Sequence, residues 1–231
     1  MTAYLIAVGT LFAESQASTP SPRVLVVVYG QLRGGRLAWR TLTKRILEYY
    51  TADLALLGPP KADQTNRASY LHQKAKYVWD VDEKPDWGVV LDDVSQDDQL
   101  RFKWRRLCLI KEQFLGGVKP CNHSGSGGIQ LAYRHLALQK ISTAQLVSVY
   151  DWFIYTRSDY VYLCSPLPIK LLPNDAIYLP TGQGYGGYTD RWSAGKVHHK
   201  LAQYGVLAKY PEEIEEAENT CATGYWDMLE E

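Results

Sequence analysis

The stretch VLVVVY, at Val24–Tyr29, is a continuous apolar run in which β-branched valines dominate. A run of this kind, with no alternation between apolar and polar residues, is typical of a strand that is buried on both faces of a sheet. It stops at Gly30, and the pair Gly34-Gly35 indicates a turn a few residues later. We therefore expect a buried strand that ends in a glycine-containing loop.

A helix and a second strand are predicted directly after this loop. Apolar side chains recur at helical spacing in residues 37–50, and residues 53–57 form another apolar run that is closed by Gly58-Pro59-Pro60. The order strand, loop, helix, strand is typical of a β-α-β unit, which joins parallel strands. The first part of the chain therefore predicts an α/β fold.

The rest of the chain continues to alternate between strand-like and helix-like segments. Further short strands are predicted at residues 77–79, 89–91, 152–156 and 176–179, and further helices at residues 100–114, 129–141 and 190–204. We expect one α/β sandwich over residues 23–231, with a mostly parallel central sheet and helices on both faces. We see no internal repeat and no clear second domain in the sequence.

Composition narrows the function classes. Among 231 residues, 25 Lys and Arg balance 25 Asp and Glu, so the chain lacks the basic surplus of a nucleic-acid binder. The chain has 17 Tyr and 7 Trp but only 4 Phe, and rings with a polar atom suit both ligand grooves and ordinary cores. Four widely spaced cysteines form no C-x-x-C pair, and we expect buried or free thiols in preference to two disulfides.

The N-terminal segment, residues 1–22, is set apart from the predicted fold. Residues 4–13 (YLIAVGTLFA) have the length of a signal-peptide core and fall short of the roughly 20 residues of a membrane span, but no Lys or Arg precedes them. They are either a signal or anchor remnant or an N-terminus without a targeting role. The first case implies the secretory pathway or the Golgi, with membrane association only through this segment, and the second implies the cytoplasm.

The loop after the first strand, YGQLRGG at residues 29–35, is the first candidate site. Open α/β sheets bind ligands at the carboxyl ends of their strands, and the start of the following helix favours an anion. Arg33 is suited to a charge-assisted bond with a phosphate, and Gln31 lies beside it. The dinucleotide spacing G-x-G-x-x-G is absent. The competing interpretation is an ordinary turn with a surface arginine.

A second candidate is Arg157-Ser158-Asp159, which follows the buried-strand pattern WFIYT. A carboxylate at such a place can bind Mg²⁺ or Mn²⁺ together with a diphosphate, because these ions take few protein oxygens. The alternative is an aspartate in a salt bridge or a turn. His198, in a histidine pair downstream, is either a further metal ligand or a surface residue.

The third candidate is GYGGYTDRW, residues 184–192, in which glycines and aromatic rings surround Asp190 and Arg191. Aromatic faces stack on sugars or bases, and Asp190 is suited to act as a general base toward a hydroxyl within its reach. The alternative is a helix N-terminus that is capped by Thr189 or Asp190.

Three of these stretches, taken in order, resemble the nucleotide-sugar glycosyltransferases of the GT-A type. Residues 24–35 resemble their first strand and nucleotide-binding turn, residues 151–168 resemble the strand that ends in the D-x-D motif, and residues 185–195 (YGGYTDRWSAG) resemble an acceptor-side segment. The resemblance extends over residues 23–204. It implies a GT-A-like, Rossmann-type sandwich and transfer of a hexose or pentose from a UDP- or GDP-sugar to a glycan or other hydroxyl acceptor.

The resemblance also implies roles for individual residues. Asp159 matches the last Asp of D-x-D, which binds the metal, Mn²⁺ or Mg²⁺, and the donor diphosphate, whereas Arg157 stands where the first Asp would be. Asp190 matches the acceptor-side carboxylate and is the expected catalytic base. The expected donor-binding residues are Gln31, Arg33, Arg157, Ser158 and Asp159, the acceptor-binding ones are Tyr185, Gly186, Gly187, Asp190 and Arg191, and the metal ligands are Asp159 and His198.

Two other functions stay open at this point. The missing first Asp, together with a chain that ends sooner than its apparent relatives, fits a degenerate, non-catalytic domain that binds a glycan or a nucleotide. A phosphoryl transferase on another α/β fold is the third alternative, although the G-x-x-x-x-G-K-S/T loop of such enzymes is absent.

Overall fold

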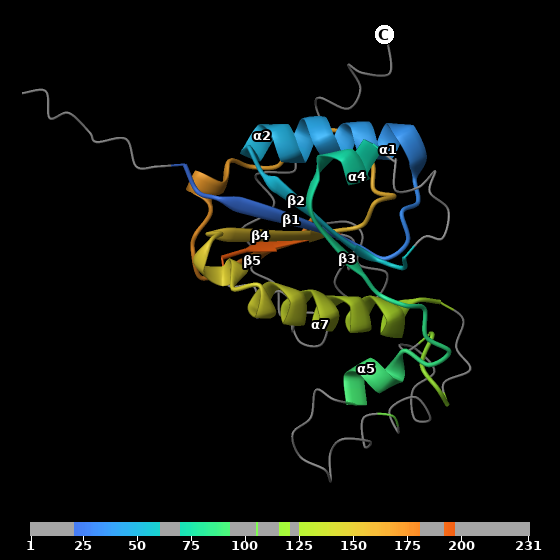
Figure 1. The fold of residues 1–231 in the computed structure, drawn as a ribbon. Coiled ribbons are helices and arrows are strands. Elements are labelled where there is room, and N and C mark those ends of the chain that lie inside the picture. Colours follow the sequence, from blue (N-terminus) through green and yellow to red (C-terminus); the bar gives the residue numbers. More distant parts are fainter. Residues whose placement is uncertain are drawn as a thin grey trace, which may run out of the picture.

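A computed structural model of the protein describes residues 21–60, 70–92, 105, 116–120, 125–180 and 192–196. Within these residues the strands form a six-stranded sheet in the order β3-β2-β1-β4-β6-β5 (Figure 1). The strands are β1 (Val24–Tyr29), β2 (Asp53–Gly58), β3 (Ala75–Asp80), β4 (Trp152–Thr156), β5 (Ile177–Tyr178) and β6 (Trp192–Gly195).

Strand direction changes across the sheet. Strand β1 pairs in parallel with both β2 and β4, and β2 pairs in parallel with β3, whereas β6 runs antiparallel to its neighbours β4 and β5. The prediction of an α/β fold is confirmed. The predicted, mostly parallel sheet is a mixed sheet, because β6 reverses the direction on one side of β4.

Helices cover both faces of the sheet, as predicted (Figure 1). On one face lies the helical segment made of α1 (Gly35–Leu42), a π-helical turn η1 (Thr43–Leu47) and α2 (Glu48–Tyr50), beside α4 (Tyr70–Lys74). On the other face lies α7 (Gly127–Thr143), with α5 (Gly88–Asp92) beyond it. Two 3₁₀ turns, η3 (Leu146–Ser148) and η4 (Ile169–Leu171), flank β4 in the chain.

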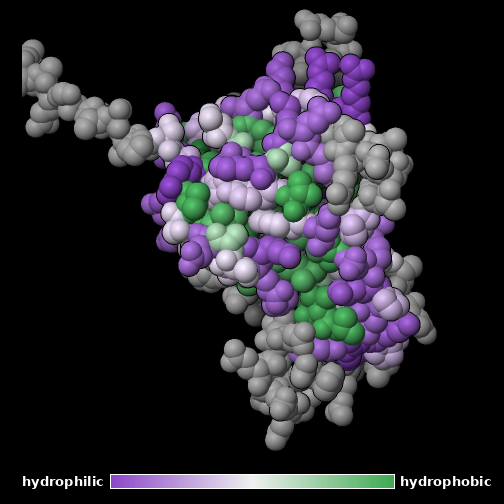
Figure 2. All heavy atoms as spheres, in the orientation of Figure 1, coloured by the Kyte–Doolittle hydropathy of each residue, from purple (hydrophilic) through white to green (hydrophobic). Residues whose placement is uncertain are grey.

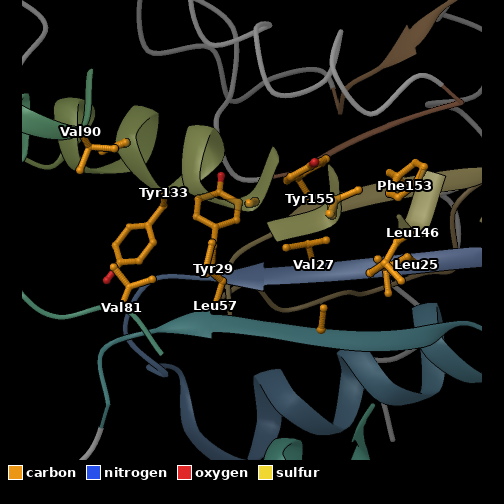
Figure 3. Packing of buried hydrophobic residues seen from close by; sticks show 14 of the residues in the cluster. Leu25, Val27, Tyr29, Leu57, Val81, Val90, Tyr133, Leu146, Phe153 and Tyr155 are labelled. Carbon is orange, nitrogen blue, oxygen red and sulfur yellow. The ribbon is translucent and has the colours of Figure 1, made fainter. Parts of the chain in front are cut away.

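The core consists of two layers, one on each face of β1, because successive side chains of a strand point to opposite faces. Val24, Val26 and Val28 pack toward α1 and η1, in a cluster with Leu42 and Ile46. The alternate residues of β1 point to the opposite face, toward α7; they are Leu25, Val27 and Tyr29, and they pack with Ala132, Tyr133, Ala137 and Ile141 (Figure 3). The continuous apolar run of β1 is therefore buried on both faces, as its sequence predicts.

Hydrophilic residues dominate the surface of the layer that holds α1 and α2, and apolar residues reach the surface in patches below it (Figure 2). Among the described residues, no helix is both long enough and apolar enough to cross a bilayer. The apolar run at residues 4–13 lies outside the described residues, so its role stays a prediction.

Two predictions of secondary structure are wrong. Residues 89–91 belong to helix α5 instead of a strand, because a three-residue apolar run carries no period and Asp86 Oδ1 accepts the Gly88 N–H at 2.8 Å, at the start of the helix. The predicted helix at residues 190–204 is a strand over Trp192–Gly195. Pairing with β4 and β5 on its two sides decides its conformation and overrides intrinsic propensity.

The expectation of free thiols is also corrected in the described part of the chain. Cys164 lies six residues after Ser158 and is disulfide-bonded. The predicted helix at residues 100–114 lies outside the described residues except for Arg105.

Candidate functional site

The carboxyl ends of β1 and β4 lie side by side, because these strands pair in parallel and Val28 stands opposite Thr156. From β1 the chain continues to β2 and β3 on one side of the sheet, and β4 begins the other side. Open α/β sheets bind ligands in the crevice at such a switch point. The loop that follows β1 and the loop that follows β4 therefore meet where a ligand site is expected.

Ser158 joins these two loops. Its Oγ donates a hydrogen bond to the Gln31 carbonyl at 3.0 Å and accepts one from the Arg33 N–H at 2.8 Å. The residue is only 2% exposed, so both bonds are shielded from water. Ser158 therefore fixes the backbone on which the side chains of Gln31 and Arg33 stand.

Ser158→Ala should lower the free energy of unfolding by about 1 to 3 kcal/mol, because it leaves a shielded N–H and a carbonyl without their partner. Denaturant unfolding measures the change. Ser148→Ala is the matched control, since Ser148 Oγ donates to the Gln145 carbonyl at 2.8 Å in an exposed turn. Equal losses in the two variants would show that the Ser158 bonds do not tie the loops together.

Arg33 is held at the edge of the site by a chain of side chains. Its Nε and Nη2 donate to Gln31 Oε1 at 3.0 and 2.6 Å, and Gln31 Nε2 donates to Glu83 Oε1 at 3.3 Å. The guanidinium is thereby oriented before any ligand arrives. Glu83 was not expected from the sequence, in which it is one of several acidic residues between predicted elements.

Arg157 and Asp159 form a two-point ion pair. Arg157 Nε donates to Asp159 Oδ1 at 2.9 Å and Nη2 donates to Oδ2 at 2.7 Å. Burial acts to raise the pKa of Asp159, but the bonds and charge of Arg157, helped by the charge of Arg33, outweigh burial and lower it. Asp159 is therefore held as a carboxylate.

These side chains line one cleft. Its walls include Gln31, Arg33, Arg157 and Asp159, and its empty volume is about 550 Å³ with the solvent at its mouth included. Tyr29 and Gly30 also line it, and both belong to the candidate loop at residues 29–35. The sequence did not predict the remaining lining residues, which are Glu83, together with Ser126, Ile129, Gln130 and Tyr133 from the start of α7. Two guanidinium groups and two carboxylates line the cleft, so their formal charges cancel.

The structure thus brings together four of the predicted donor-binding residues and places the fifth, Ser158, directly behind them. The remaining predicted residues lie outside the described part of the chain and stay predictions; they are Tyr185, Gly186, Gly187, Asp190, Arg191 and His198.

The described residues do not fit the expected metal site as they stand. Mg²⁺ and Mn²⁺ take carboxylate oxygens, and both oxygens of Asp159 already accept hydrogen bonds from Arg157. Within the described ranges, no three His, Cys, Asp or Glu side chains gather closely enough to hold a metal ion. A cation at Asp159 would have to share the carboxylate with the Arg157 guanidinium or displace it.

Comparison of the chain with protein-family models gives no match, and comparison with curated proteins gives none either.

Proposed function

We propose that this protein is a glycosyltransferase that moves a sugar from a nucleotide-sugar donor to a hydroxyl acceptor. One observation carries the proposal: Gln31 and Arg33 from one loop, and Arg157 and Asp159 from another, line a single cleft at the switch point of the sheet. Strands β3-β2-β1-β4 follow the first four positions of the Rossmann strand order 3-2-1-4-5-6, which supports a GT-A-like fold.

The side chains of the cleft suit the leaving group of this reaction. When the bond between the sugar and the diphosphate breaks, negative charge grows on the diphosphate, and guanidinium groups stabilise such charge by two-point hydrogen bonds. Arg33 is already oriented by Gln31, so little reorganisation is needed. Asp190 is the proposed base that takes the proton of the acceptor hydroxyl as its oxygen attacks the sugar carbon.

A second candidate function is a non-catalytic domain that binds a glycan or a nucleotide. The observation that favours it is the Arg157–Asp159 pair, in which the guanidinium and the carboxylate bind each other. Turnover separates the two functions, because only a transferase consumes the donor in the presence of an acceptor.

An oxidising compartment is part of the proposal. Disulfides persist in secreted proteins and in the lumen of the secretory pathway and are rare in the cytosol. The disulfide at Cys164 therefore favours the secretory route over the cytoplasm. This route agrees with a signal or anchor at residues 4–13.

Donor binding should raise the thermal midpoint, because a ligand that binds only the folded state stabilises it, by about 2.7 kcal/mol at 100 times its Kd. UDP- and GDP-sugars are tested with Mn²⁺ and with EDTA, since the resemblance implies a metal and the EDTA arm shows whether one is needed. Asp159→Ala should abolish the shift, because Arg157 loses the carboxylate that positions it, whereas Asp175→Ala, at an exposed position, should preserve it. If no donor shifts the midpoint under either condition, the proposal fails.

A further inference from the structure

Two residues of helix α7 that line the cleft each carry a buried polar atom, Gln130 Oε1 and Tyr133 Oη. Neither has a hydrogen-bond partner among the described residues. Buried polar atoms are nearly always paired, and each one left unpaired costs about 1 to 3 kcal/mol. An unpaired buried atom at the wall of a cleft therefore indicates a place where a ligand supplies the missing bond.

The position of these two atoms separates them from the other unpaired ones. Tyr155 Oη, Trp192 Nε1 and Ser193 Oγ are also buried without a partner in the described part, but their residues do not line the cleft. Gln130 and Tyr133 both do, beside Arg157 and Asp159. One wall of the cleft therefore carries two polar atoms that form no hydrogen bond with its charged residues.

The geometry of α7 places the two side chains on one face, because residues three apart in a helix are neighbours. Tyr133 is 2% exposed, and its ring packs against Trp87 with a centroid distance of 4.8 Å. Figure 3 shows the ring reaching from α7 toward Val81, with the hydroxyl at its far end. Such packing holds the hydroxyl at a fixed place.

The hydrogen-bonding capacity of the two atoms is matched by a hydroxyl group of a ligand. An amide oxygen only accepts hydrogen bonds, so the ligand must donate to Gln130 Oε1, and a tyrosine hydroxyl both donates and accepts. A phosphate oxygen that carries no proton cannot donate to the amide. A sugar hydroxyl can donate to Gln130 and accept from Tyr133. The cancelling charges of the cleft also suit an uncharged group at this wall.

We infer that Gln130 and Tyr133 form the subsite that binds the hydroxyl groups of the transferred sugar, whereas Arg33 and Arg157 face the diphosphate. The inference rests on the proposed function and assigns the sugar end of the donor to the first turns of α7.

Titration calorimetry on the intact protein tests the subsite with two probes, the nucleoside diphosphate and its nucleotide sugar. Tyr133→Phe keeps the ring and removes only the hydroxyl, so it should weaken the nucleotide sugar about tenfold and leave the nucleoside diphosphate unchanged. Gln130→Met, a near-isosteric change, should act in the same direction. The matched control is Tyr155→Phe, which removes an unpaired buried hydroxyl that does not line the cleft and should change neither affinity.

The outcomes are distinct. If both α7 variants bind the nucleotide sugar with wild-type affinity, the subsite is overturned. An equal loss of affinity for both probes overturns it too, because such a loss would indicate a structural role. A wild-type protein that binds neither probe overturns the proposed function and the subsite with it. The thermal midpoint of unliganded Tyr133→Phe should equal or exceed that of the wild type, because the lost hydroxyl has no partner in the described structure.

Discussion

Gly34→Ala is expected to lower the free energy of unfolding by about 2 to 5 kcal/mol and, under the proposed function, to abolish donor binding. Gly34 has a φ of +87°, in the left-handed region that favours glycine. A Cβ at this position would lie 2.5 Å from Asp159 Cα and 2.8 Å from the Ser158 carbonyl oxygen, closer than real contacts allow. The loop after β1 can therefore approach the loop after β4 only because Gly34 has no side chain.

Gly30→Ala is the matched control for this variant. Gly30 has nearly the same φ, +85°, but a Cβ there would meet nothing within 4 Å. Gly30→Ala should therefore show only the cost of a left-handed alanine, about 1 to 3 kcal/mol. The difference in the free energy of unfolding between the two variants, measured by denaturant unfolding, is the cost of separating the two loops. Equal losses would mean that this close approach contributes nothing to the site.

The strands that position the cleft are predictable from sequence because each is buried on both faces. VLVVVY and WFIYT read as continuous apolar runs, and β1 and β4 have the predicted bounds. The edge beyond β4 is not predictable in this way. Strand β6 is the short segment WSAG, with no apolar period, and it is a strand only because β4 and β5 pair with it.

The cleft likewise contains some residues whose place can be predicted from sequence and others whose place cannot. Gln31, Arg33 and Asp159 follow directly after buried strands, so their place at the carboxyl edge of the sheet can be predicted. Glu83 and Tyr133 reach the cleft from other elements, and nothing in the local sequence signals this. Tyr133 in particular has the spacing of a core residue on an amphipathic helix, and its ring does pack in the core.

Arg105→Ala is expected to cost about 3 kcal/mol of stability, because it removes the guanidinium that pairs with two shielded carboxylates. Arg105 donates to Asp92 through Nε at 2.9 Å and Nη2 at 2.6 Å, and to Asp86 through Nη1 at 3.0 Å. It also contacts the Lys119 carbonyl. These bonds hold the two ends of α5 and the turn at residues 116–120 to one guanidinium, on the side of the sheet that carries α7 (Figure 1).

A surface ion pair of equal length provides the control. Lys76 Nζ lies 2.6 Å from Asp53 Oδ2, the same distance as between Arg105 Nη2 and Asp92 Oδ2, but the Lys76 and Asp53 side chains are 51% and 39% exposed. Those of Arg105 and Asp92 are 16% and 10% exposed. Exposed pairs contribute little, so Lys76→Ala should leave the thermal midpoint nearly unchanged. Similar effects of the two variants would show that burial does not determine how much the Arg105 ion pairs contribute to stability.

Acid unfolding gives an independent measurement of the Arg105 cluster. Burial acts to raise the pKa of Asp86, but the N–H groups of Lys119 and Gly88 and the guanidinium of Arg105 outweigh it and lower the pKa. The stability from this carboxylate is therefore present above its unfolded pKa of about 3.9 and is lost as the pH falls through its lower, folded pKa. Without Arg105 the folded pKa moves upward, so Arg105→Ala should begin to unfold at a higher pH than the wild type. An unchanged acid midpoint would mean that the backbone N–H groups alone hold Asp86 ionised.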